Sequence, residues 1–355
     1  MSEDNRNIRI VDIAKLAGVS PGTVDRVLHN RGKVSAEKRE KVEKVLKEIN
    51  YEPNIMARSL ALKRHYTIVV LIPGFESGNY WDTLNNGIVR AARELVNFNV
   101  NVRYLLFDQY NVNSFIAQSK TLLQNDFDAV LIAALFKEPV IELSKSLDEK
   151  EIPYVYIDSF ISGQNNLAYF GANSFESGAV AGKLMMYDVG RDSDVFIANI
   201  RTNNKKDSSQ TYSREQGFRD YLSKNGFSGQ IHEVELSDDY ALTLRRINDL
   251  IEHNGKLQGG IVFNSRVHEL VGMLFHKMSR PHNIRLIGYD AIEKNLAALR
   301  KGQVSFLLSQ RSDIQGYNGI KALSNFLIFG KRTEKTNYMP IDILIKENIE
   351  YYNNL

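Results

Sequence analysis

The segment VDIAKLAGVSPGTVDRVL at Val11–Leu28 constrains the fold of this chain more than any other. Its apolar residues recur at the spacing of two short amphipathic helices; they are Ile13, Ala14, Leu16, Ala17, Val24, Val27 and Leu28. Between them, Gly18 can adopt the positive φ that ends a helix, and Ser20 is a strong N-cap followed by Pro21, which has no N–H to leave unbonded. Two helices joined in this way form a helix-turn-helix, whose second helix lies in the major groove of DNA.

The same segment also matches a motif of a different chemistry. Gly18–Gly22 reads GVSPG and fits the G-x-S-x-G nucleophile elbow of hydrolases. That elbow requires a buried strand before the serine, whereas a helical pattern precedes Ser20 here. We therefore favour DNA binding over hydrolysis for this segment.

Two more helical patterns follow the helix-turn-helix. Ser35 can cap a helix that has Glu37 in its first turn and an apolar stripe up to Ile49. Residues 54–62 form another helical pattern, which is too short to be stable alone because isolated helices under about 12 residues are marginal. We therefore expect a head at residues 1–53 and a hinge helix with a basic linker at residues 54–65.

Charge is distributed unevenly along the chain. Residues 1–65 contain 14 Lys and Arg against 9 Asp and Glu, a formal charge of +5, and the remainder contains 31 against 33, a charge of −2. A basic head on a faintly acidic body is the distribution expected of a protein that binds DNA through one part of its surface. A difference of this size also arises by chance, so it supports the motif without replacing it. The charged run Glu37–Lys47 is interpreted as a solvated helix face or as a set of phosphate contacts.

Beyond His65 the pattern changes to alternating strands and helices. The continuous apolar run Thr67–Pro73 is typical of a parallel strand covered on both faces. The alternation predicts an α/β body at residues 66–355 with two doubly wound parallel-sheet lobes. Lobe one is expected at about 66–161 plus 292–329, and lobe two at about 166–290 plus 330–355.

Five short motifs resemble those of the LacI/GalR (lactose and galactose repressor) family, in family order. They are AKLAGVS, TVDRVL, VSAEKREKV, NYEPN and MARSLA. The resemblance extends over essentially the whole chain. It implies a three-helix DNA-binding head, a hinge helix that folds on operator DNA, and a ligand-sensing body of the periplasmic sugar-binding-protein type. It also implies a homodimer on pseudo-palindromic double-stranded operator DNA.

The resemblance places the DNA contacts in the second helix and in the hinge. The expected DNA-binding residues are Ser20, Pro21, Gly22, Thr23, Arg26, Asn30, Asn54, Ala57, Arg58 and Leu60. Pro21 and Gly22 stand where relatives often carry base-reading side chains, and neither has a hydrogen-bonding side chain, so Arg26 is expected to read bases. Leu60 matches the residue that kinks DNA from the minor groove in relatives, or it packs within a static linker. Arg9 replaces the usual cap of the first helix, which Asp12 can offset.

Ligands of doubly wound sheets bind outside the carboxyl ends of the strands, and the loops expected there carry polar and aromatic residues. The candidate ligand-binding residues are Tyr80, Trp81, Asp158, Tyr212, Arg214, Tyr240, Asn264, Asp290 and Gln310. Aromatic rings cover the C–H faces of a sugar, while carboxylates and amides bond its hydroxyl groups. In the alternative, Trp81 is a core residue, and Asp158 and Asp290 cap helices.

Two departures from the family pattern concern the ligand site. Ser265 replaces the acidic residue that follows the asparagine in relatives. Tyr212 stands five residues before Gly217, where relatives often carry an arginine that grips sugar hydroxyls. Either Arg214 takes over this contact or the site lacks it, so the effector need not be an ordinary free pyranose.

Other functional classes find little support in the sequence. The chain has no Cys, no apolar leader at its N-terminus and no apolar run of membrane-spanning length, so we expect a cytoplasmic protein. There is no H-E-x-x-H motif or Walker loop, and His268 and His276 are interpreted as surface or packing residues. We therefore expect neither an enzyme nor a bound cofactor or metal.

Two functions remain open. The first is a transcriptional repressor gated by a small polar ligand, a sugar or a sugar derivative, between the lobes. The second is a DNA-bound regulator controlled by a protein partner such as a phosphocarrier, with a degenerate ligand site. A well-lined cleft favours the first, and a collapsed cleft with an exposed apolar patch favours the second.

Overall fold

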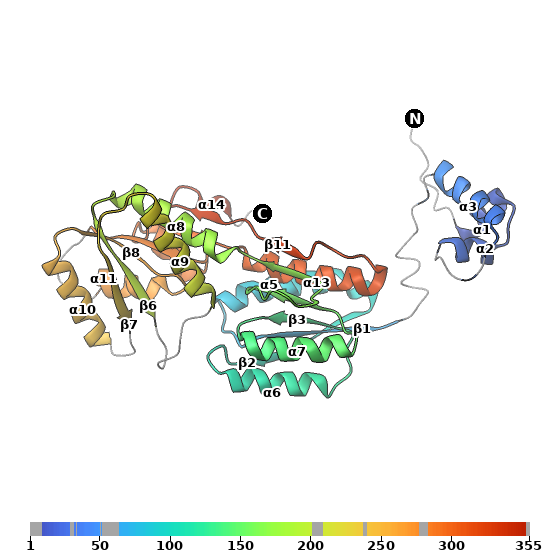
Figure 1. Ribbon diagram of the computed structural model, residues 1–355, viewed down its shortest axis with the longest axis horizontal. Coiled ribbons are helices and arrows are strands. Elements are labelled where there is room, and N and C mark those ends of the chain that lie inside the picture. The colour runs from blue at the N-terminus through green and yellow to red at the C-terminus, as the bar shows by residue number, and fades with distance from the viewer. Residues whose placement is uncertain are drawn as a thin grey trace. The chain divides into compact units, whose positions relative to one another are not determined.

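The computed structural model describes residues 9–28, 32, 34–49, 51, 64–200, 209–236, 240–276 and 283–352. The chain divides into two compact units, Met1–Arg64 and His65–Leu355. The first unit is helical and the second is an α/β body, which confirms the predicted fold class (Figure 1). The candidate DNA contacts at Asn30, Asn54, Ala57, Arg58 and Leu60 lie outside the described residues, and the expectations for them stay predictions.

Three helices form the head: α1 (Ile10–Ala17), α2 (Pro21–Leu28) and α3 (Ala36–Glu48). Each contributes one fully buried side chain to a small core, namely Ile13, Val24 and Val42. Leu16 is 63% exposed, contrary to the prediction, because it lies at the margin of the stripe formed by the other apolar residues of α1.

The turn between α1 and α2 has the predicted chemistry. Gly18 adopts a left-handed φ of 63°, and the Val19 N–H donates to the Ala14 carbonyl at 3.0 Å, which closes a Schellman motif. The Ser20 hydroxyl accepts from the Thr23 N–H at 3.2 Å, which confirms Ser20 as the cap of α2.

The two other predicted caps differ from each other. Asp12 accepts from the Arg9 backbone N–H at 3.1 Å, so it completes the start of α1 in the absence of a Ser or Thr cap. Ser35 occupies the expected N-cap position of α3, but its side chain makes no capping hydrogen bond. There, the Ser35 carbonyl accepts from the Arg39 N–H at 3.0 Å.

Lobe one is built on a six-stranded parallel sheet with the order β11-β5-β4-β3-β1-β2. Its strands are β1 (Tyr66–Pro73), β2 (Val100–Phe107), β3 (Ala129–Ala133), β4 (Tyr154–Ile157), β5 (Ala168–Gly171) and β11 (Thr336–Tyr338). Its helices are α5 (Tyr80–Glu94), α6 (Val112–Leu123), α7 (Lys137–Glu149) and α13 (Ser312–Phe329). Because α5 and α13 cover one face and α6 and α7 the other, the central strands are buried on both sides (Figure 1).

Lobe two repeats this plan with the strand order β12-β10-β9-β8-β6-β7, in which β12 alone is antiparallel to its neighbour. Its strands are β6 (Asp194–Ile200), β7 (Ile231–Leu236), β8 (Leu257–Ile261), β9 (Arg285–Tyr289), β10 (Phe306–Ser309) and β12 (Asp342–Leu344). Its helices are α8 (Ser174–Val189), α9 (Ser209–Lys224), α10 (Tyr240–His253), α11 (Val267–His276), α12 (Glu293–Arg300) and α14 (Ile349–Tyr352). Two apolar clusters, one on each face of the sheet, hold the lobe together.

The predicted lobe boundaries are wrong in three places. The segment at 292–309 was expected to return to lobe one, but β10 pairs with β9 and α12 packs on α11. Conversely, β5 and β11 belong to the sheet of lobe one, although residues 166–171 and 336–338 were assigned to lobe two. Apolar periodicity identifies a strand without saying which sheet it joins, which explains these errors.

Candidate functional site

A cavity of about 490 Å³ lies between the two lobes, at the carboxyl ends of their strands. Seven of the nine candidate ligand residues line it: Tyr80, Trp81, Asp158, Arg214, Asn264, Asp290 and Gln310. Tyr212 is 63% exposed on α9 and does not line the cavity, so its prediction as a ligand-binding residue is wrong. The side chain of Tyr240 lies outside the described residues.

Two aspartates occupy equivalent positions in the two lobes. Asp158 follows β4 and Asp290 follows β9, both are buried, and both have left-handed backbones with φ values of 68° and 67°. The Asp158 N–H donates to Phe170 on the neighbouring strand, and the Asp290 N–H donates to Leu308 in the same way. Neither aspartate is the N-cap of a described helix. The structure therefore contradicts the capping alternative and places a carboxyl group of each lobe in the cavity wall.

The aromatic pair at the start of α5 forms the lobe-one side of the cavity. The Tyr80 hydroxyl donates to Asp158 Oδ1 at 2.6 Å, and the Tyr80 and Trp81 rings pack edge to face at 5.0 Å. The Trp81 indole N–H donates to Gln109 Oε1 at 2.9 Å, a partner that sequence reasoning missed. Trp81 is 5% exposed and packs into the lobe-one core, and it also lines the cavity. Its contact with a ligand stays a prediction.

Arg214 lies inside the cavity wall and carries the positive charge that the sequence left in doubt. Its side chain is 3% exposed and stacks on the Tyr289 ring at 4.3 Å. One terminal nitrogen donates to the Phe263 carbonyl at 2.7 Å and the other to Gln210 Oε1 at 3.1 Å. Gln210, four residues earlier on α9, in turn donates to the Asp158 carbonyl across the two lobes. The i, i+4 spacing from Arg214 is the signal that could have identified Gln210.

Burial sets the protonation of these groups. It raises the pKa of Asp290 to about 6, against the opposing effect of the Arg214 guanidinium. It also raises the pKa of Asp158, which the hydrogen bond from Tyr80 opposes. Burial and the neighbouring Asp158 carboxylate raise the pKa of Tyr80 well above its usual value, so Tyr80 remains a donor.

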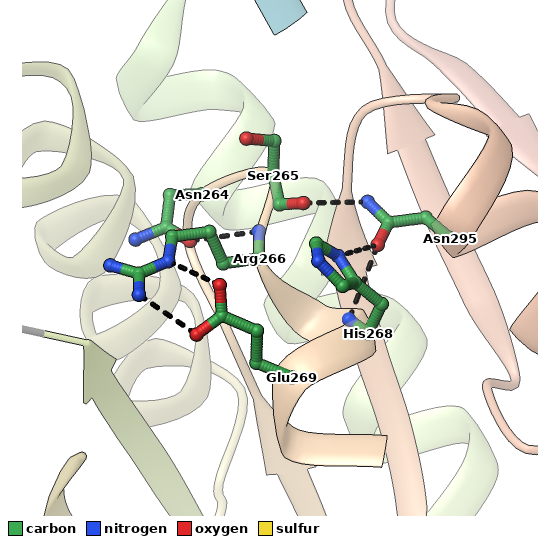
Figure 2. A network of polar contacts seen from close by, with 6 residues as sticks. All are labelled: Asn264, Ser265, Arg266, His268, Glu269 and Asn295. Carbon is green, nitrogen blue, oxygen red and sulfur yellow. Dashed lines mark hydrogen bonds and ion pairs between the residues drawn. The ribbon is translucent and has the colours of Figure 1, made fainter. Parts of the chain in front are cut away.

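A second group of polar contacts fixes the loop that follows β8 (Figure 2). Asn264 Oδ1 accepts from the Arg266 N–H at 3.0 Å, and the Arg266 guanidinium forms two bonds to Glu269, at 2.7 and 2.8 Å. Ser265, which replaces the acidic residue of relatives, contributes its carbonyl, which accepts from Asn295 at 2.9 Å. This loop is therefore held by the Arg266–Glu269 pair and by Asn295, without an acidic side chain at position 265.

Asn295 connects this loop to Asp290. The side chain is fully buried on α12, and its Oδ1 accepts from the His268 backbone N–H at 3.2 Å and lies 2.9 Å from His268 Nδ1 (Figure 2). Its amide also donates to the Asp290 carbonyl at 3.0 Å. His268, expected to be a surface or packing residue, is half-buried and also lines the cavity, so sequence reasoning missed its place at the site. The side chain of His276 lies outside the described residues.

Two other expectations concern metals and membranes. Within residues 9–352, apart from the ranges that the structure leaves undescribed, no group of three His, Cys, Asp or Glu side chains is placed to bind a metal ion. Over the same part of the chain, no helix combines the length and hydropathy that a membrane span requires.

The raised pKa of Asp290 leads to a prediction for stability. Its folded-state pKa of about 6 exceeds the ordinary value of 3.8, so the free energy of unfolding should fall as pH rises from 3.8 to 6 and then level off. The expected decrease is on the order of 3 kcal/mol. Urea unfolding of wild type and Asp290→Asn between pH 4 and 7 should show a larger decrease in the wild type, because the raised pKa of Asp158 acts in both proteins. An identical pH dependence in both proteins would contradict the assignment.

Comparison with known proteins gives two family matches. Residues 9–54 match bacterial regulatory proteins of the lacI family, and residues 68–332 match the periplasmic binding protein domain. The sucrose operon repressor of Pediococcus pentosaceus is 24% identical over 327 residues, which span 86% of this chain and 93% of that protein. The ribose operon repressor of Halalkalibacterium halodurans is 25% identical over 285 residues, which span 80% of each.

Solved structures agree with these matches. A crystal structure described as a LacI transcriptional regulator from Bacteroides fragilis is 36% identical with a TM-score of 0.76, and the match covers 81% of this chain and all of that one. GanP, a glucose-galactose binding protein from Geobacillus stearothermophilus, has a TM-score of 0.65 at 20% identity, which shows a common fold alone. This second match covers 81% of this chain and 99% of GanP.

Proposed function

Because the chain belongs to the LacI family of bacterial regulatory proteins, we propose that a small polar ligand in the cavity of its body switches its affinity for operator DNA. The chain is a DNA-binding transcriptional repressor of this family, with a body like that of periplasmic binding proteins, and it is not an enzyme. The proposed ligand is a sugar or a sugar derivative. Relatives named as repressors of a sucrose and a ribose operon support this class.

The observation that carries the proposal is a pair of polar atoms without partners in the cavity wall. Within the described part of the chain, Arg214 Nε and Gln310 Oε1 are buried and have no hydrogen-bond partner. Buried polar atoms are normally bonded, so an unused donor and an unused acceptor in one cavity indicate a ligand that supplies both. A hydroxyl group does so, since it can accept from Arg214 and donate to Gln310 or to the Asp290 carboxylate.

The same cavity favours a small ligand over a protein partner such as a phosphocarrier. Its wall contains carboxylates, amides and guanidinium groups beside aromatic rings, which is the composition of a site for a polyol. A degenerate site would have lost these convergent groups.

Fluorescence of the full-length protein tests the proposal, because Trp81 is the single Trp of the chain. The protein is titrated with ribose, glucose, galactose, sucrose and their phosphate esters, and binding is checked by calorimetry. We expect one of these compounds to change the Trp81 emission and to alter operator affinity in parallel. If no compound binds and a phosphocarrier protein alters operator affinity instead, control by a protein partner replaces this proposal.

The DNA-binding face leads to a further prediction, at Arg26. Val24 and Val27 are buried in the head while Pro21, Gly22 and Arg26 are exposed on α2, so Arg26 is the long donor on that face. Arg26→Ala should weaken operator binding by about 1–3 kcal/mol and relax the base preference at one position per half-site.

Selection from a randomised operator pool measures this preference. The control is Lys44→Ala, which removes an exposed positive charge from α3 and should leave base preference unchanged. Equal weakening on all sequences by Arg26→Ala would assign it to a phosphate contact.

We also propose that the protein acts in the cytoplasm as a homodimer on a pseudo-palindromic operator, since a two-fold protein matches a two-fold site. Sedimentation of the protein alone and with operator DNA tests the stoichiometry. Binding of one chain per operator would contradict it.

A further inference from the structure

Gln315 is a fully buried amide in the first turn of α13, and it does not line the ligand cavity. Both ends of its side chain are bonded. Its Oε1 accepts from the Asp158 N–H at 3.2 Å, and its Nε2 donates to the Gln310 carbonyl at 2.9 Å. Asp158 ends a strand of lobe one, and Gln310 follows the last parallel strand of lobe two. One side chain thus connects the two lobes behind the cavity.

The connection continues to the second cavity carboxylate. Gln310 Nε2 donates to Asp290 Oδ1 at 3.0 Å. A continuous path therefore runs from the Asp158 backbone through the Gln315 amide and Gln310 to the Asp290 carboxylate. Glutamine suits this position because it offers a donor and an acceptor on one side chain, whereas glutamate has no donor when ionised.

The neighbour of Gln315 ties this path to the aromatic pair of lobe one. A Cβ added at Gly316 would lie 2.3 Å from the Leu84 carbonyl oxygen, so α13 and α5 are in backbone contact there. Since α5 carries Tyr80 and Trp81 at its start, the first turn of α13 cannot move independently of these residues. Gln315 is thus bonded toward Asp290 and held by packing near Trp81.

We propose that Gln315 is a positioning residue that holds the cavity groups of the two lobes in one arrangement, so that a ligand meets both carboxylates at once. It acts through Asp158 and Gln310 without touching the ligand. The inference rests on the proposed function for its effect on binding, but its effect on lobe arrangement does not need a ligand. Loss of this bridge leaves a buried carbonyl without its donor and allows the lobes to sample other arrangements.

The first measurement therefore uses the ligand-free full-length protein. The chain has no native Cys, so Lys145→Cys on α7 and Glu252→Cys on α10 place one spin label on each lobe at exposed positions. We expect one narrow interlobe distance distribution in this background and a broader or shifted one after Gln315→Met. The matched control is Ser324→Ala, which removes a fully buried polar group of the same helix that bonds only its own turn. An unchanged distribution in Gln315→Met would overturn the proposal whether or not a sugar is known.

The second measurement uses the sugar that changes Trp81 fluorescence in the wild type. Gln315→Met should lower the affinity of the folded protein about 10–100-fold, and Ser324→Ala should not. Substitution of a purely structural residue would instead lower the unfolding temperature and leave the affinity of the folded fraction unchanged.

A second variant applies if Gln315→Met does not fold. Gln315→Glu keeps the acceptor and loses the donor, so it tests the bond to the Gln310 carbonyl by itself. If neither variant folds, wild-type hydrogen exchange decides: the Asp158 amide should gain protection with sugar, and no gain overturns the proposal.

Discussion

Arg214→Ala is expected to abolish the response to ligand and to destabilise the body by about 3–5 kcal/mol, the cost of removing one partner from a buried charge cluster. Among the described residues, Arg214 is the only buried Lys or Arg, and it lies in the cavity wall with the buried carboxyl groups of Asp158 and Asp290. Its guanidinium lowers the pKa of both carboxyl groups against the effect of burial. Without it, the pKa of both groups should rise further, and the Nε donor proposed to bond a ligand hydroxyl is lost.

The measurement combines sugar titration, operator binding and urea unfolding of the full-length protein. The sugar affinity should fall by at least about 100-fold, while operator binding by the head persists. The control is Arg219→Ala, which removes the same type of side chain from α9 five residues later, where it pairs with the half-buried Glu215 and the exposed Glu233. Because Arg219 is partly exposed and does not line the cavity, this variant should keep the sugar affinity of the wild type and lose less stability than Arg214→Ala. If the two variants had the same sugar affinity and the same free energy of unfolding, Arg214 would have no role in the ligand site.

The polar groups at strand ends were predictable because their positions depend on local sequence. Asp158 and Asp290 each follow an apolar strand, and carboxyl ends of parallel strands gather at one edge of a sheet. Gln109 and Gln210 were missed because their roles depend on partners from other elements, namely the Trp81 indole and the Asp158 carbonyl. No local pattern marks the partner of Gln109, whereas the position of Gln210 four residues before Arg214 on the same helix is a signal that sequence reasoning could have used.

The assignment of elements to lobes was the part that sequence could not provide. The pairing of β5 with β4, and of β11 with β5, is a contact between distant segments that any apolar strand of similar length could make. The role of Gln315 follows from the same topology, because α13 returns to lobe one directly after β10 of lobe two. In the sequence, nothing distinguishes Gln315 from any other polar residue near the start of a helix.

Close helix pairing in each lobe leads to the second large prediction. In lobe one, a Cβ at Gly87 of α5 would lie 1.7 Å from the Asp313 carbonyl oxygen of α13. In lobe two, a Cβ at Gly217 of α9 would lie 1.9 Å from the Phe175 carbonyl oxygen of α8. Both contacts are with backbone, which cannot rotate away, so each helix pair must separate to admit a methyl group.

Gly87→Ala and Gly217→Ala should therefore each destabilise the body by about 3 kcal/mol or more, although alanine favours a helix over glycine by about 1 kcal/mol. The control is Gly272→Ala on α11, where an added Cβ meets no heavy atom within 4 Å and should be neutral or stabilising. Urea unfolding compares the three variants. Because α5 carries Trp81, Gly87→Ala should also shift the fluorescence of the ligand-free protein. Gly217→Ala should leave this fluorescence unchanged, but it should weaken sugar binding because α9 carries Arg214. If all three variants had the same free energy of unfolding, the helix pairs would be able to separate without loss of stability, which would contradict the prediction.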